Sequence, residues 1–288
     1  MIHPGGEPWR LAWIIYRKGN KYRMTGPQIW HYGLVARDWA EFQTDGGQEA
    51  AYFRTMIDTF GGPALDLGCG SGRLLLPYLA AGLDVDGCDY SGDMLDQCRE
   101  RANREGLVPQ LYQQSTYELD LPRRYRTIFA CGVVGLGGDR RLTMQAMARC
   151  YEHLRPDGAF VFDYSPRWND PPAWLSRLPE VRHTLPDEWP ESGEHERLED
   201  GCELELVART VAMDPLEDVA TRQIRARLWK NGEMLQEEIH TQKVEDYSKH
   251  ELILMLERAG FRNIRITGDY RDEPATADHG TLVFICRK

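Results

Sequence analysis

The chain has 288 residues, of which 42% are hydrophobic and 28% are charged, as in an ordinary globular protein. This length allows one full α/β domain and a sizeable insertion. The formal net charge of -10 argues against a nucleic-acid partner, because phosphate backbones are held by clustered Lys and Arg side chains.

Residues 1–27 read as a basic N-terminal extension that contains a second methionine, Met24. We expect a loosely attached extension or an upstream start site, or else a lid or an oligomer arm. The apolar run from Leu11 to Tyr16 is too short to span a bilayer, and no small-residue cleavage site follows it. The sequence therefore predicts neither a targeting segment nor a membrane anchor.

The seven cysteines include no C-x-x-C pair and lie mostly within apolar strands or helices. They are typical of reduced thiols in a cytoplasmic protein, rather than of a disulfide framework or a zinc site. No His and carboxylate residues have metal-ligand spacing, so we expect no metal.

A tight turn with three glycines at alternate positions, Gly68, Gly70 and Gly72, follows a short apolar run. Glycine lets the backbone fold sharply between a strand and a helix and leaves no side chain to keep a ligand away. The dinucleotide fingerprint places its third glycine one position later, where this chain has Arg73. The spacing therefore fits a nicotinamide or flavin dinucleotide poorly.

Asp66 stands just before this turn. A carboxylate there would repel a pyrophosphate but would attract an ammonium group or a sulfonium. S-adenosylmethionine carries both of those cations, so the turn favours this cofactor.

A second strand ends at Asp89, about 20 residues beyond the turn, which is the usual place for a ribose-binding acid. Its carboxylate can accept two hydrogen bonds from a ribose diol, and Tyr90 and Met94 can cover an adenine ring. With Asp66-Leu67-Gly68-Cys69-Gly70-Ser71-Gly72 and Asp89, the chain resembles the class I S-adenosylmethionine-dependent methyltransferase family. The resemblance covers residues 30 to 165 and resumes at residue 248.

This resemblance implies an α/β fold with a doubly wound, seven-stranded, mostly parallel sheet of the Rossmann-like kind, whose final strand is antiparallel. It also implies that the segment from Trp30 to Trp39 folds over the cofactor. After the third strand the family has an acid near the adenine amino group, whereas Ser115 stands there in this chain. The cofactor-binding residues expected from the motifs and the resemblance are Tyr32, Arg37, Asp66, Gly68, Cys69, Gly70, Arg73, Asp89, Tyr90, Met94, Ser115, Thr116, Tyr117 and Gly132.

Strands and helices alternate through the first half of the chain. A helix over 47–60 precedes strands at 63–67, 84–88, 109–113, 126–132 and 158–163, and helices are expected to end near 81 and to cover 91–105 and 140–154. Such alternation predicts a parallel sheet with helices on both faces and a ligand at the carboxyl ends of its strands.

An antiparallel insertion is predicted over 164–245, between a cofactor-binding core at 28–163 and its completion at 246–288. Alternating patterns predict strands at 202–213 and 221–229, and Asn231-Gly232 is a strong hairpin signal before a strand through Ile239. The insertion resembles the substrate-covering insert of sugar N-methyltransferases, which implies a cover that excludes water from the acceptor. A sheet that forms a homodimer is the alternative.

The region from Trp168 to Trp189 is aromatic, and the residues after it are acidic. Such a wall suits a cationic or amine-bearing acceptor, although a charge run is also typical of a solvated face. Ser248 and Glu251 then form a capping box that opens a last helix ending at Gly260, before strands at 261–267 and 281–285.

The sequence thus predicts an S-adenosylmethionine-dependent methyltransferase that acts on a small molecule at nitrogen or oxygen. Positioning alone is enough for an amine acceptor, whereas an oxygen or carbon acceptor needs a general base. Candidate bases are Tyr164, His240, Tyr247 and His279, although a lone His is more often structural than catalytic. The alternatives are a non-catalytic protein that binds the same cofactor, for example in regulation, and an NAD-dependent oxidoreductase.

Overall fold

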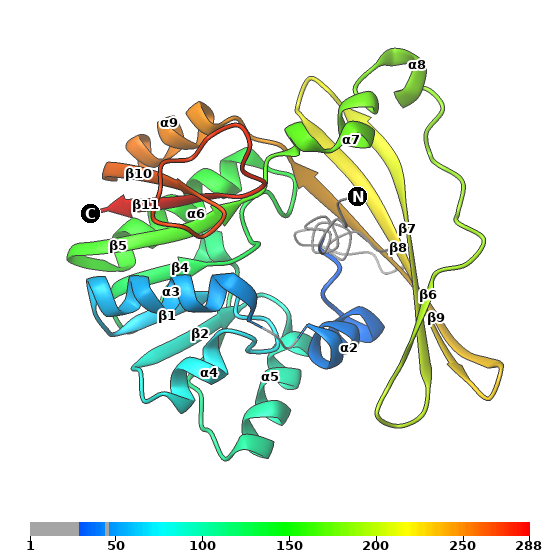
Figure 1. Cartoon of the computed structure of the whole chain (residues 1–288), viewed down its shortest axis with the longest axis horizontal. Coiled ribbons are helices and arrows are strands. Elements are labelled where there is room, and N and C mark those ends of the chain that lie inside the picture. Colours follow the sequence, from blue (N-terminus) through cyan, green and yellow to red (C-terminus); the bar gives the residue numbers. More distant parts are fainter. Residues whose placement is uncertain (1–28, 44–45) are drawn as a thin grey trace, which may run out of the picture. The chain divides into compact units, whose positions relative to one another are not determined.

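The computed structural model describes residues 29–43 and 46–288 (Figure 1). The predicted extension over 1–27 lies outside these described residues. Two compact units can be distinguished, and we refer to them as the core unit and the sheet unit. The core unit comprises His31–Gly135, Asp139–Pro166 and Asp246–Lys288, and the described part of the sheet unit comprises residues 29–30, Leu136–Gly138 and Arg167–Glu245.

The core unit is built on a seven-stranded sheet of order β10-β11-β5-β4-β1-β2-β3. Its strands are β1 (Ala64–Leu67), β2 (Val85–Asp89), β3 (Leu111–Gln113), β4 (Tyr125–Ala130), β5 (Leu154–Tyr164), β10 (Arg262–Gly268) and β11 (Leu282–Arg287). β1 to β5 pair in parallel, whereas β11 runs antiparallel to both of its neighbours. The predicted doubly wound, mostly parallel sheet is confirmed.

Helices pack on both faces of this sheet because successive strand residues point to opposite sides. The helices of the core unit are α2 (Gly33–Phe42), α3 (Gly47–Phe60), α4 (Leu75–Ala80), α5 (Gly92–Glu105), η1 (Thr116–Glu118), α6 (Arg140–His153) and α9 (Lys249–Ala259). One buried cluster joins residues of α6 and α9 to Leu65 and Ile128. A second joins residues of α3, α4 and α5 to the adjacent Ala64 and Phe129.

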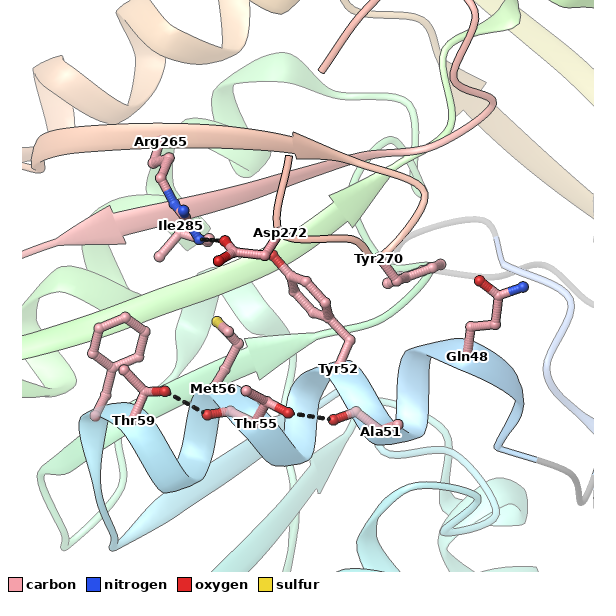
Figure 2. A pocket seen from close by; sticks show the side chains of 11 residues that line it. Gln48, Ala51, Tyr52, Thr55, Met56, Thr59, Arg265, Tyr270, Asp272 and Ile285 are labelled. Atoms are coloured by element: carbon pink, nitrogen blue, oxygen red, sulfur yellow. Dashed lines mark hydrogen bonds and ion pairs between the residues drawn. The ribbon is translucent and has the colours of Figure 1, made fainter. Parts of the chain in front are cut away.

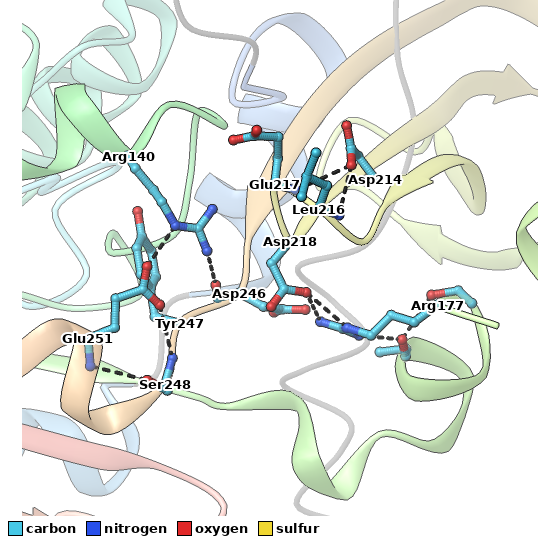
Figure 3. Close-up of polar contacts among 12 residues, drawn as sticks. Arg140, Arg177, Asp214, Leu216, Glu217, Asp218, Asp246, Tyr247, Ser248 and Glu251 are labelled. Carbon is cyan, nitrogen blue, oxygen red and sulfur yellow. Dashed lines mark hydrogen bonds and ion pairs between the residues drawn. The ribbon is translucent and has the colours of Figure 1, made fainter. Parts of the chain in front are cut away.

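The last helix, α9, begins at the predicted capping box. The Ser248 hydroxyl accepts from the Glu251 N–H at 3.1 Å, the Glu251 carboxylate accepts from the Ser248 N–H, and Gly260 ends the helix in the left-handed conformation. Arg140 of α6 donates to Glu251 at 2.7 Å and to the carbonyl oxygen of Asp246 at 2.6 Å (Figure 3). These contacts fix the chain where it re-enters the core unit.

The sheet unit contains a four-stranded antiparallel sheet of order β6-β7-β8-β9. Its elements are η2 (Arg167–Asn169), α7 (Pro171–Leu175), α8 (Pro179–Arg182), β6 (Glu194–Arg197), β7 (Glu203–Asp214), β8 (Val219–Lys230) and β9 (Glu233–Glu245). Asn231 and Gly232 form the predicted hairpin turn, with φ of 52° and 81°. Gly137 donates its N–H to the carbonyl oxygen of Lys243 on β9 at 3.0 Å.

Some elements differ from the sequence prediction. β5 begins at Leu154, four residues earlier than predicted, and β9 continues past Ile239 to Glu245. α2 lies within a segment for which no helix was predicted, and β6, α7 and α8 were missed. None of the described helices has the length and apolar character needed to cross a membrane.

The aromatic region of the sheet unit contacts cationic side chains of the protein. The guanidinium of Arg209 lies 4.0 Å from the ring centre of Trp189, and that of Arg225 lies 5.0 Å from it. Arg177 lies 5.3 Å from the ring of Trp174 and is itself paired with Asp218 at 2.9 Å (Figure 3). These rings therefore contact cations of the protein itself.

Candidate functional site

The glycine turn lies between β1 and α4, at the carboxyl end of β1. Gly68, Gly70 and Gly72 have φ of 80°, 53° and 84°, a region that favours glycine. A Cβ atom at Gly68 would lie 2.4 Å from Val133, and one at Gly72 would lie 2.7 Å from the Cys98 sulfur. Backbone conformation and close packing thus both require these glycines.

Asp89, at the end of β2, contacts this turn directly. One carboxylate oxygen accepts from the Gly70 N–H at 2.9 Å and the other accepts from the Ser91 N–H at 2.8 Å. Burial raises the pKa of Asp89, while these hydrogen bonds oppose the rise. Each carboxylate oxygen has a further lone pair, so both can still accept from a diol.

The segment before α2 is fastened to the start of α5. The Gly33 N–H donates to Asp93 at 2.7 Å, and the Ser91 hydroxyl donates to the carbonyl oxygen of His31. This brings the ring of Tyr32 to 6.5 Å from that of Tyr90, in an edge-on arrangement. Arg37 is paired with Glu41 on its own helix at 3.0 Å.

Of the other predicted cofactor residues, Met94 lies beside the glycine turn, with its methyl carbon 2.9 Å from the position of a Cβ atom at Gly70. Cys69 is buried within the turn. Ser115 precedes the short helix η1, which contains Thr116 and Tyr117.

The Ser115 hydroxyl donates to a carboxylate oxygen of Glu118 at 2.7 Å. Ser115 thus stands where the family has an acid, and it is hydrogen-bonded to the acidic Glu118 three residues later. The sequence prediction did not name Glu118.

Asp66 lies on β1 and is 2% exposed. Burial raises its pKa to about 8, although Arg73 and the N–H of Leu75 oppose the rise. Arg73 is mainly engaged elsewhere, because it donates to Glu49 at 2.6 Å and to the sulfur of Cys131 at 3.4 Å.

Asp163, at the carboxyl end of β5, joins residues that are far apart in the sequence. It accepts from the Gly132 N–H at 2.6 Å, from the Cys131 thiol at 3.4 Å and from the Tyr270 hydroxyl at 2.5 Å. Burial raises the pKa of this carboxyl too. Asp163 thereby holds the start of the loop that follows β4.

Tyr270 has a left-handed backbone, with φ of 56°, which is unusual for a bulky residue. It also lines a groove of about 740 Å³ along α3, next to the ion pair of Arg265 and Asp272 (Figure 2). The groove is formed by α3, β11 and the residues around the β10–β11 loop, and none of the residues of the glycine turn lines it.

Sequence reasoning missed Glu49, Asp163 and Tyr270. The position of Asp163 at the carboxyl end of a parallel strand was a usable signal. No local pattern marks Tyr270, which lies 107 residues from Asp163 along the chain.

Three of the four candidate bases lie in the core unit and one lies in the sheet unit. Tyr164 accepts from the backbone N–H of Tyr247 at 2.6 Å, and both are buried. His279 accepts from the N–H of Thr276 in its own loop at 2.9 Å. His240 lies on β9 of the sheet unit, where its Nε2 is 3.0 Å from a carboxylate oxygen of Glu238.

The charges around the glycine turn suit a cationic ligand. Glu49, Asp66 and Asp163 are buried carboxyl groups and Asp89 is a half-buried one, whereas the guanidinium of Arg73 is paired with Glu49. A ligand that carries a sulfonium and an ammonium would favour the ionised forms of Asp66, Asp89 and Asp163, whose pKa values burial raises, whereas a pyrophosphate would disfavour them. No metal-binding group of three or more His, Cys, Asp or Glu side chains occurs within 29–43 and 46–288.

A seven-stranded sheet with an antiparallel last strand, and a glycine turn bonded to an acid at the end of β2, define the class I methyltransferase fold. Residues 64–158 match the family model described as a methyltransferase domain. This segment is therefore a class I methyltransferase domain, which confirms the resemblance predicted from the glycine turn and Asp89.

Comparison with known proteins agrees. A protein of Geobacillus sp. (strain WCH70) named as a methyltransferase is 32% identical over 101 residues, which are 34% of this chain and 40% of that protein. This chain spans less than half of the length of the curated relatives it matches.

Solved structures extend the likeness to most of the chain. An S-adenosylmethionine-dependent methyltransferase from Clostridium acetobutylicum ATCC 824 has a TM-score of 0.66 at 16% identity, covering 88% of this chain and 97% of that one. The sugar N-methyltransferase KedS8 from Streptoalloteichus sp. ATCC 53650 has a TM-score of 0.64 at 16% identity, and 100% of both chains is covered. At such identities this likeness establishes the fold alone.

Proposed function

We propose that the protein binds S-adenosylmethionine and transfers its methyl group to a small molecule, at nitrogen or oxygen. The observation that carries the proposal is the contact of Asp89 with the Gly70 N–H, which places an acid with spare lone pairs beside a glycine turn. Bound S-adenosylmethionine supplies an electrophilic methyl group on a sulfonium.

Each part of the cofactor has candidate partners in the core unit. Asp89 would accept from the ribose hydroxyls, and Tyr90 and Met94 would cover the adenine. The residues from Ser115 to Tyr117 would meet the adenine edge. The cationic methionine end would favour ionisation of Asp66, whose pKa burial raises to about 8.

A small acceptor is supported by two features. The four-stranded sheet is inserted where the sequence predicts a substrate-covering insertion. The sugar N-methyltransferase KedS8 shares the fold over both complete chains. The net charge of -10 disfavours a nucleic-acid acceptor.

The test is calorimetric titration with S-adenosylmethionine, S-adenosylhomocysteine and NADH. We expect both adenosyl ligands to bind and NADH not to bind. Asp89→Asn should weaken adenosyl binding by about tenfold or more, because hydrogen bonds to a charged group contribute about 1.5–3 kcal/mol. Asp96→Asn, an exposed substitution of the same kind on α5, is the matched control.

Circular dichroism of both variants shows whether weaker binding reflects a lost hydrogen bond or an unfolded protein. Preference for NADH, or no binding of either adenosyl ligand to the unaltered protein, would refute the proposal. If S-adenosylmethionine binds but no amine or alcohol causes its conversion to S-adenosylhomocysteine, the protein is instead a non-catalytic binding protein.

A further inference from the structure

Three segments of the core unit that are distant in the sequence meet at the carboxylate of Asp163, near the end of β5. One oxygen accepts from the Gly132 N–H at 2.6 Å, and the other accepts from the Tyr270 hydroxyl at 2.5 Å and from the Cys131 thiol at 3.4 Å. Asp163 is only 7% exposed. Its carboxylate therefore joins the start of the loop after β4 to the loop between β10 and β11.

The loop after β4 packs against the glycine turn. A Cβ atom at Gly68 would lie 2.4 Å from a methyl carbon of Val133. Gly132, which precedes Val133, is exposed, has φ of 67° and has open space where a side chain would begin. Bare backbone beside open space lets a ligand approach closely. The hydrogen bond from Gly132 to Asp163 thus fixes the orientation of an exposed peptide next to the glycine turn.

The order of the strands indicates which part of the cofactor would meet this peptide. β1 lies between β2 and β4, and the three strands are parallel, so their carboxyl ends share one edge of the sheet. Asp89, the proposed partner of the ribose, ends β2. With the adenine beside Tyr90 and Met94, the amino-acid end of S-adenosylmethionine would extend past β1 toward the carboxyl end of β4 and Gly132.

The β10–β11 loop holds Tyr270 in place for its contact with Asp163. The φ of Tyr270, 56°, is uncommon for a bulky residue, and such conformations persist only where the surroundings impose them. The preceding Asp269 accepts from the Thr281 N–H at 2.8 Å and donates its own N–H to the carbonyl oxygen of Thr281 at 2.9 Å. The ring of Tyr270 packs edge-on against Tyr52 of α3, with ring centres 5.9 Å apart (Figure 2).

We propose that Asp163 is a positioning residue for the amino-acid end of S-adenosylmethionine, and that the Tyr270 hydroxyl holds its carboxylate in the required orientation. Asp163 acts through the peptide of Gly132 and takes no part in the chemistry at the methyl group. The inference rests on the proposed function and deepens it, because it assigns a role in cofactor binding to the contact between Asp163 and Tyr270.

The test compares two ligands that differ only at the amino-acid end. S-adenosylhomocysteine carries this end, whereas 5′-methylthioadenosine has a methyl group in its place and keeps the adenine, the ribose and the sulfur. In calorimetric titrations, Tyr270→Phe should weaken the binding of S-adenosylhomocysteine by about tenfold, as expected for the loss of a hydrogen bond to a charged group. Its affinity for 5′-methylthioadenosine should stay unchanged. Asp163→Asn should show the same selective loss.

Tyr52→Phe is the matched control. It removes a hydroxyl from the same pair of rings, but this hydroxyl is hydrogen-bonded to that of Thr267 at 2.7 Å and not to Asp163. Both ligands should bind Tyr52→Phe as tightly as they bind the unaltered protein. Urea unfolding of the variants measures their losses of stability. A hydroxyl with a purely structural role would change the stability without changing the ratio of the two affinities.

The outcomes separate this inference from the proposed function. If the unaltered protein does not bind S-adenosylhomocysteine, the proposed function itself fails. If it binds, but Tyr270→Phe keeps the full affinity or loses affinity for both ligands alike, the positioning role is refuted and the proposed function stands. Tyr270→Phe decides the question even if Asp163→Asn does not fold, because Phe keeps the ring that packs against Tyr52.

Discussion

Replacing Asp66 by Asn should stabilise the protein above neutral pH. Burial raises the pKa of this carboxyl from its ordinary 3.8 to about 8. At about 1.4 kcal/mol per pH unit, an ionised Asp66 therefore lowers the free energy of unfolding by about 6 kcal/mol. Asn has nearly the same shape and keeps an oxygen that can accept from the Leu75 N–H, but it cannot ionise.

The direction of the pH dependence follows from proton binding. Between pH 3.8 and about 8 the folded state holds a proton on Asp66 that the unfolded state has released. The free energy of unfolding therefore falls as the pH rises through this window, by about 4 kcal/mol from about pH 5 to about pH 9. Asp66→Asn removes this contribution.

Urea unfolding at these two pH values, followed by circular dichroism, measures the effect. Asp96→Asn serves as the control, because its side chain is 70% exposed and its pair with Arg99 contributes little. Its free energy of unfolding should change by less than about 0.5 kcal/mol. Equal pH slopes for Asp66→Asn and the unaltered protein would refute the reasoning.

Two further predictions concern the core unit. Gly72→Ala should lower the free energy of unfolding by more than about 2 kcal/mol, because the new Cβ atom would lie 2.7 Å from the Cys98 sulfur. The control Gly106→Ala, at φ of 69° with open space around it, should lose only about 1 kcal/mol through backbone strain. Equal losses of the two variants in urea unfolding would contradict this. His153 accepts from the Leu121 N–H at 3.0 Å, and burial lowers its pKa below 6.5. The folded state therefore binds this proton less readily, so stability should fall as the pH drops below 6.5, and His153→Gln, measured by urea unfolding in the Asp66→Asn background, should lack that loss.

The fold was predictable where local patterns are strong. The strands of the core unit are short apolar runs between turn signals, and the structure has them within a few residues of the expected bounds. β6 was missed because its sequence, Glu-His-Glu-Arg, has no alternation of apolar and polar residues. The α2 helix was missed because its sequence begins with a glycine and has no capping side chain.

The candidate site was predictable only in part, for a related reason. Gly70 and Asp89 are marked by their spacing along the chain, whereas the contact of Tyr270 with Asp163 depends on how β5 and β11 pair.

The departure from the dinucleotide fingerprint has a structural reason. Gly72 packs against α4 and α5, because a Cβ atom there would lie 2.8 Å from Leu76 and 2.7 Å from Cys98. The next residue, Arg73, has a long side chain, and its guanidinium pairs with the carboxylate of Glu49 at 2.6 Å. A guanidinium that is already paired with a carboxylate has little charge left for a pyrophosphate, and a pyrophosphate would oppose ionisation of the buried Asp66 still further. The same residues that weaken the case for a dinucleotide therefore strengthen the case for a sulfonium cofactor.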